Sequence, residues 1–158
     1  MIPDMATFDF ITHKGFRASL ESDYQEMQSC LGSGAWKSVQ VLAGSMVESL
    51  LIDYIAFTLA AKTKKSPLAM DLKEAIDLCK AEKALSERSA DLCSVVKSYR
   101  NLIHPGRMVR LNEPPPDKDS ATVASRLVHM IAAELANARI EKEGMTADQI
   151  ASKVIKDS

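Results

Sequence analysis

The residues with the clearest chemical potential lie in one short stretch, SYRNLIHPGR, residues 98–107. It contains Arg100, Asn101 and His104, and a Pro-Gly pair follows the histidine. Arginine presents a planar, permanently charged fork that suits phosphate oxygens, and histidine exchanges protons near neutral pH. A proton-transferring imidazole and a guanidinium that stabilises a charged phosphate are the minimum for cleaving RNA without a metal ion. The stretch is therefore a candidate site for chemistry on a phosphate.

The charges around this stretch point to an anionic partner. From Leu92 to Asn112 there is no acidic residue, whereas Lys97, Arg100, Arg107 and Arg110 are basic. The 158-residue chain has a net charge of -1, so an anion or RNA site must come from such local clustering. One alternative stays open. Cationic side chains in the last turn of a helix stabilise it through its dipole and require no ligand.

Apolar residues recur at spacings of three and four, which predicts helices. Thr146 and Gln149 have the spacing of a capping box, which indicates a short last helix. The predicted helices are about Lys14–Cys30, Ala35–Ala61, Ser66–Lys80, Ser86–Ile103, Ser120–Glu141 and 146–156. Pro105 is expected to end the fourth helix near His104, because proline disfavours the α conformation of the residue before it. The sequence thus predicts one all-α domain over residues 1–158, a compact bundle of about five to six helices with its core at about 14–141.

The second predicted helix has so broad an apolar surface that we expect it at the centre of the bundle. Glu48 lies midway along it, and a buried carboxylate needs a partner. Glu48 either pairs with Arg100 and positions it, or faces solvent at the edge of the bundle. On the fourth helix Arg100 and His104 are four residues apart and would project from nearly the same side.

Two stretches resemble the HEPN superfamily, compact helical-bundle proteins of prokaryotic defence, toxin systems and RNA processing. They are YRNLIHPGR (99–107) and VLAGSMVESLLIDYI (41–55), and the resemblance covers about residues 35–107. It implies a homodimer with the two Arg-His motifs in a shared cleft and, in many members, metal-independent endoribonuclease activity. Arg100 would then contact the scissile phosphate, His104 would be the acid or base, and Asn101 would orient one of them.

Whether the chain is an enzyme stays open. The first hypothesis is a HEPN-like endoribonuclease, a toxin or defence effector with an antitoxin or defence-system partner. The second is a non-catalytic HEPN-like module that binds RNA, a nucleotide or a protein. Only three residues separate Arg100 from His104, fewer than the catalytic pattern of the family usually has, which favours the second hypothesis. A third is a helical dimerisation domain in which the motif only caps a helix.

We expect no metal or other cofactor. The three cysteines are odd in number and include no CxxC pair, which argues against a disulfide framework and a thiolate zinc site. The first residues lack the basic and apolar regions of a secretory signal. The longest apolar stretch, Val41–Ala61, contains Glu48 and Asp53, which favours a buried helix over a membrane span. A cytoplasmic location without membrane contact is therefore expected.

Overall fold

The computed structural model describes residues 8–99, 103–112 and 114–143. Within these ranges the chain forms six α-helices and two single turns of 3-10 helix, and no strand. The α-helices are α1 (Lys14–Ser33), α2 (Trp36–Thr58), α3 (Leu72–Ala81), α4 (Glu87–Tyr99), α5 (Pro105–Leu111) and α6 (Lys118–Glu143); the 3-10 turns are η1 (Ala60–Lys62) and η2 (Pro67–Ala69). The predicted all-α class and compact bundle are confirmed.

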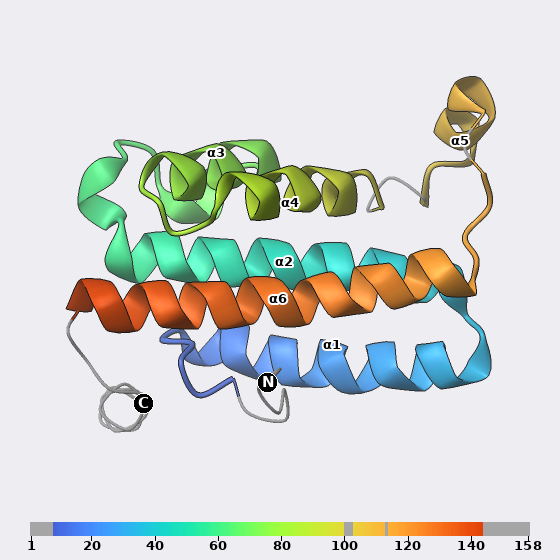
Figure 1. Cartoon of the computed structure of the whole chain (residues 1–158), viewed down its shortest axis with the longest axis horizontal. Helices are drawn as coiled ribbons and strands as arrows, with labels where there is room; N and C mark the ends of the chain where they lie inside the picture. The colour runs from blue at the N-terminus through green and yellow to red at the C-terminus, as the bar shows by residue number, and fades with distance from the viewer. Residues whose placement is uncertain (1–7, 100–102, 113, 144–158) are drawn as a thin grey trace.

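The long helices are arranged in layers around α2 (Figure 1). Helices α2 and α6 lie side by side in the middle, α1 packs on one side of them, and the α3–α4 pair covers the other side. Helix α5 stands apart from the body, at the end where α1 finishes and α6 begins. The bundle therefore leaves one short helix outside its layers.

Helix α2 supplies the centre of the core, as its wide apolar surface predicts. Its fully buried side chains include Val39, Met46, Leu50 and Ile55. By length and composition α2 is the one helix in the described ranges that could cross a membrane, but 56% of its most apolar window is buried within the bundle. Burial of apolar side chains on several sides is what a central bundle helix requires.

The segment before α1 is part of the core, which periodicity alone did not predict. Phe8 and Ile11 are fully buried. The backbone N–H groups of Thr12 and His13 donate to the two carboxylate oxygens of Asp53, at 3.2 and 2.8 Å. Asp53 lies on α2 and is only 1% exposed. Asp53, one of the two acidic residues in the apolar run of α2, thus binds the segment that leads into α1 to the bundle.

Arg139 of α6 completes this buried polar cluster. Its guanidinium lies 3.6 Å from the Asp53 carboxylate and donates to the backbone carbonyl of Phe10 at 2.9 Å. Burial raises the pKa of the Asp53 carboxyl, an effect larger than the opposing influence of the two N–H groups and of Arg139. The cluster therefore joins α2, α6 and the N-terminal segment through groups that are costly to leave without partners.

Two helix starts differ from prediction. Helix α3 begins after Asp71, whose carboxylate accepts a hydrogen bond from the N–H of Glu74 at 2.8 Å, whereas Ser66 and Pro67 only lead into the 3-10 turn η2. Helix α6 begins slightly earlier than predicted, because the carboxylate of Asp117 accepts from the N–H of Ser120. The predicted last helix over 146–156 lies outside the described residues.

The largest difference concerns the end of the fourth helix. Helix α4 is described as far as Tyr99, Ile103 is not α-helical, and a separate helix, α5, starts at Pro105, where no helix was predicted. His104 is the N-cap of α5, with extended backbone angles of φ -106° and ψ 91°. Proline disfavours a helical residue before it, but its own fixed φ suits the first position of a helix. Pro105 therefore accounts for the extended backbone of His104 and for the start of α5.

Candidate functional site

The structure places His104 outside α4, on the surface of the molecule. Its backbone is extended and its imidazole makes no capping hydrogen bond to α5. The prediction that one helix would present Arg100 and His104 from the same side is therefore wrong for His104. Arg100 and Asn101 lie outside the described residues. Nothing in the described ranges tests the catalytic roles predicted for these three residues.

Helix α5 carries two of the predicted anion-binding residues on a surface that the core does not use. It has no buried residue, and Arg107 and Arg110 are both exposed. Beside them Val109 is 82% exposed and Leu111 is 49% exposed. A helix that buries no side chain gains little from the hydrophobic effect within this fold. The exposed basic and apolar side chains of α5 are thus available to a partner.

Lys97, in the last turn of α4, lies in a different environment. Its side chain is half-buried, and its positive charge is among the influences that lower the pKa of Asp71. The first of these influences is the hydrogen bond from the N–H of Glu74, followed, among charged groups, by Lys65. Because the negative charge of Asp71 partly offsets the positive charge of Lys97, Lys97 adds less to a basic surface than the arginines of α5 do.

Glu48 is half-buried on α2. Its predicted pairing with Arg100 falls outside the described residues because Arg100 does. The fully buried carboxylate of this helix is Asp53 instead, and its partners are backbone N–H groups and Arg139. The principle that a buried carboxylate requires partners thus applies to Asp53 on α2, and the pairing of Glu48 with Arg100 stays a prediction.

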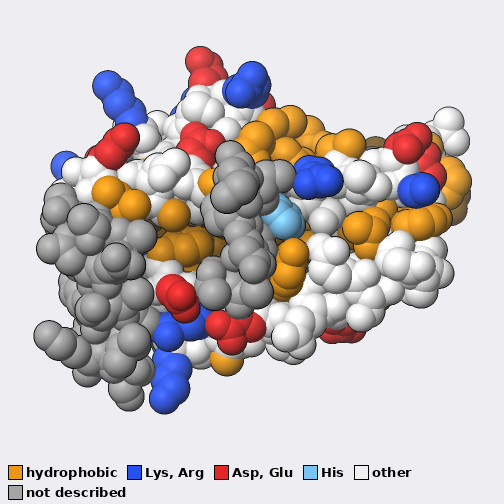
Figure 2. Space-filling model, turned by 60° about the horizontal axis from the view of Figure 1, so that its bottom comes forward, with side chains coloured by type: hydrophobic (Ala, Val, Ile, Leu, Met, Phe, Trp, Pro, Cys, Tyr) orange, Lys and Arg blue, Asp and Glu red, His pale blue; other side chains and the backbone are white. Residues whose placement is uncertain are grey.

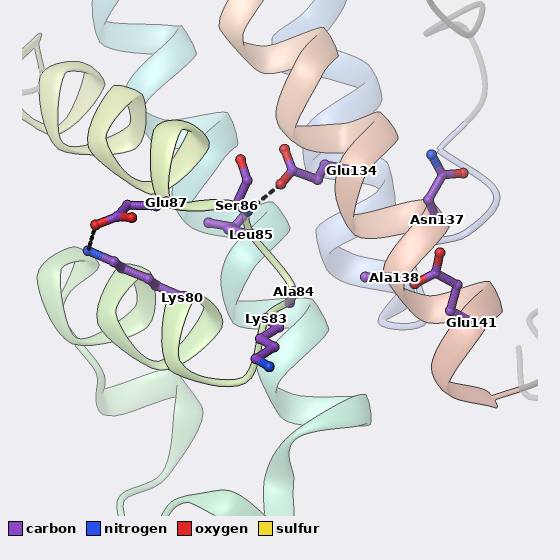
Figure 3. Close-up of a pocket in the computed structure, with 10 residues that line it drawn as sticks. All are labelled: Lys80, Lys83, Ala84, Leu85, Ser86, Glu87, Glu134, Asn137, Ala138 and Glu141. Carbon is purple, nitrogen blue, oxygen red and sulfur yellow. Dashed lines mark hydrogen bonds and ion pairs between the residues drawn. The ribbon is translucent and has the colours of Figure 1, made fainter.

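A pocket of about 540 Å³ lies between the α3–α4 turn and the C-terminal part of α6 (Figure 3). Glu134 points from α6 to the start of α4, where its carboxylate accepts hydrogen bonds from the Ser86 N–H and the Ser89 hydroxyl. Lys80 and Glu87 face each other at 3.8 Å. A carboxylate at a helix N-terminus stabilises the helix through its dipole. These charged groups already have hydrogen-bond or ion-pair partners within the protein. We therefore interpret this pocket as part of the contact between α4 and α6 rather than as a ligand site.

A second cavity, of about 280 Å³, lies between α1 and the first half of α6. On α6 it is lined by Thr122, Ser125, Arg126 and His129, which share one helical face. On the side of the bundle shown in Figure 2, hydrophobic and basic side chains reach the surface beside a histidine. Sequence reasoning missed this cavity. The polar residues at spacings of three and four in α6 were the available signal.

The described residues offer no metal centre. In the ranges 8–99, 103–112 and 114–143, no three His, Cys, Asp or Glu side chains are grouped closely enough to hold an ion. Burial raises the pKa of the Cys79 and Cys93 thiols to about 12, and Cys30 is half-buried; all three thiols are free. Buried thiols with so high a pKa, those of Cys79 and Cys93, are poor metal ligands and poor nucleophiles near neutral pH.

Comparisons with protein-family models, with curated proteins and with solved structures give no match to this chain. The resemblance to the HEPN superfamily therefore stays a prediction from residues 41–55 and 99–107. The arguments about function below rest on the residues and geometry of this chain.

Proposed function

We propose that this protein binds RNA through the basic segment that ends α4 and forms α5, residues 97–110. We call this segment the basic arm. In this proposal Arg107 and Arg110 contact the phosphate backbone, and Lys97 and Arg100 add further positive charge. The protein is then a HEPN-like binding module, cytoplasmic and homodimeric.

The observation that carries the proposal is the exposure of α5. Its two arginines project from a helix that has no buried residue, in a stretch without acidic residues. Permanently charged guanidinium groups release counterions from phosphates and account for much of the affinity for nucleic acid. RNA is preferred among polyanions because the HEPN-like stretch of residues 99–107 overlaps the start of α5.

A second candidate function is metal-independent RNA cleavage, and one observation favours it. The His104 imidazole is exposed and is not used to cap α5, so it is available to a bound substrate. His104 would take a proton from the RNA 2′-hydroxyl or give one to the leaving oxygen, and Arg100 would stabilise the charged phosphate. Asn101 would orient one of the two. In a cellular setting this activity would belong to a toxin or defence effector.

The binding proposal is tested by measuring fluorescence anisotropy of a labelled single-stranded RNA over a series of salt concentrations. The variant Arg107→Gln/Arg110→Gln should bind more weakly, and its plot of log affinity against log salt should be shallower by about 1.4, at about 0.7 per phosphate contact. The matched control is Lys37→Gln/Arg88→Gln, which removes two charges from exposed positions on α2 and α4. Equal losses in both variants would contradict a specific role for the basic arm.

Cleavage is tested on the same RNA by gel electrophoresis with and without EDTA. If the second candidate is correct, cleavage persists in EDTA and disappears in His104→Ala, while the anisotropy of freshly mixed RNA still reports binding. Intact RNA together with salt-dependent binding supports the module alone. Absence of binding at low salt rejects both proposals. Sedimentation of the free and RNA-bound protein tests the homodimer.

A further inference from the structure

The cavity between α1 and α6 has the character of a ligand site. Ser125 is 5% exposed and lines the cavity. The Nδ1 atom of His129 is buried without a hydrogen-bond partner among the described residues. Buried polar atoms are nearly always hydrogen-bonded in folded proteins, so this exception requires an explanation. A bound ligand supplies one.

The lining of the cavity selects for an anion. Arg126 contributes a permanent positive charge, and none of the lining residues is acidic. Ser125 and the Gln28 side-chain amide add neutral hydrogen-bond donors from α6 and α1, whereas the hydroxyl of Thr122 already donates to a backbone carbonyl of its own helix, at 2.7 Å. Donors that converge from two helices, together with one cation, match an oxyanion with several oxygens.

The remaining lining residues favour a ligand in which a small organic group is attached to that anion. Tyr24 and His129 lie with their ring centroids 5.6 Å apart, and Leu31 adds an apolar wall. The imidazole of His129 lines the cavity, where burial, and then the charge of Arg126, lower the pKa of this side chain. About 280 Å³ corresponds to roughly nine water molecules. That volume suits a phosphate group and a few carbon atoms.

We propose that the cavity between α1 and α6 binds a small phosphate monoester, with Arg126 holding the phosphate and Ser125 and Gln28 donating hydrogen bonds to it. The phosphate oxygens occupy the space in front of Arg126. The organic group lies against Tyr24 and Leu31, where the imidazole of His129 meets its hydroxyl groups. This site is separate from the basic arm and needs no dimer.

The test is an NMR titration of the full chain with glycerol 3-phosphate, inorganic phosphate and malonate as separate probes. Glycerol 3-phosphate should bind saturably, and it should shift an imidazole signal that is missing from His129→Gln. Arg126→Gln should raise its dissociation constant at least about tenfold. Arg88→Gln, which removes an exposed arginine from α4, is the matched control and should leave the constant unchanged. Thermal melting establishes that each variant is folded.

Three results would overturn the proposal: no saturable binding of glycerol 3-phosphate at millimolar concentration, an unchanged constant in Arg126→Gln, or binding that leaves the His129 signal unmoved. Malonate binding as tightly as glycerol 3-phosphate would overturn the choice of a phosphate. Inorganic phosphate should bind more weakly than the monoester, because it makes no contact with Tyr24 or Leu31. The Arg107→Gln/Arg110→Gln variant should retain the site, so failure of the RNA proposal leaves this one standing.

Discussion

Asp53 offers the most direct test of what holds this bundle together. Replacing it with alanine removes the acceptor of two backbone N–H groups, those of Thr12 and His13, and takes the carboxylate away from Arg139. All of this occurs where Asp53 and Arg139 are 1% and 3% exposed. The expected result is a large loss of stability with detachment of the N-terminal segment from the bundle.

The size of the loss follows from these contacts. Hydrogen bonds to a charged group contribute about 1.5–3 kcal/mol each, so the two N–H bonds correspond to about 3–6 kcal/mol. Removing one member of a buried ion pair typically costs about 3–5 kcal/mol. The two estimates describe overlapping contacts and are not added. We therefore expect Asp53→Ala to lower the free energy of unfolding by about 3–5 kcal/mol, and the melting temperature by about 6–20 °C for a chain of this length.

The assay is urea unfolding followed by circular dichroism, with limited proteolysis of the folded protein as a second measurement. Asp53→Asn is the matched control. It keeps one side-chain oxygen as an acceptor for a backbone N–H group, so its loss of stability should be smaller. Cleavage near residues 8–13 should increase in Asp53→Ala first. A loss below about 1 kcal/mol in Asp53→Ala, within the range of ordinary surface substitutions, would refute the reasoning.

Two further predictions concern thiols and acid stability. A thiol reagent at mildly alkaline pH should modify Cys30 in the folded protein. It should reach Cys79 and Cys93, whose thiols have pKa values of about 12, only in denaturant. Rapid modification of all three thiols in the folded protein would contradict the burial of Cys79 and Cys93. N–H groups of their own helix starts lower the pKa of Asp71 and Asp117, so the stability they confer is complete above their usual pKa of 3.8 and is lost as the pH falls. In acid titrations the variant Asp71→Asn/Asp117→Asn should therefore lose less stability than the unchanged protein as the pH falls.

The long helices could be predicted from sequence because each carries its own signal. Helices α1, α2 and α6 have apolar residues at helical spacing over five or more turns, and the structure confirms each with ends shifted by a few residues. The start of α3 was misplaced because Ser66–Pro67 also has the composition of a helix start. The better signal was Asp71 followed three residues later by Glu74, the spacing of a capping box.

Contacts between distant segments could not be predicted in this way. The choice of Asp53 over Glu48 as the buried carboxylate depends on which face of α2 meets α6 and the segment before α1. The cavity lined by Tyr24 and His129 arises where faces of α1 and α6 meet, across about a hundred residues of sequence. One sequence shows that a helix has a polar stripe, but the packing of neighbouring helices decides whether that stripe faces solvent, a partner or a cavity.

The position of His104 has consequences for both candidate functions. Acid–base cleavage requires the imidazole and the guanidinium to be held at a fixed separation around one phosphate. A continuous helix through His104 would have fixed that separation by its own geometry, but His104 lies outside α4 with an extended backbone. Catalysis would thus depend on bound RNA or a second protomer to align the pair, whereas phosphate binding by Arg107 and Arg110 needs only their exposure on α5. For this reason binding should survive changes at His104 that abolish any cleavage, and loss of both together would point instead to a single preformed site.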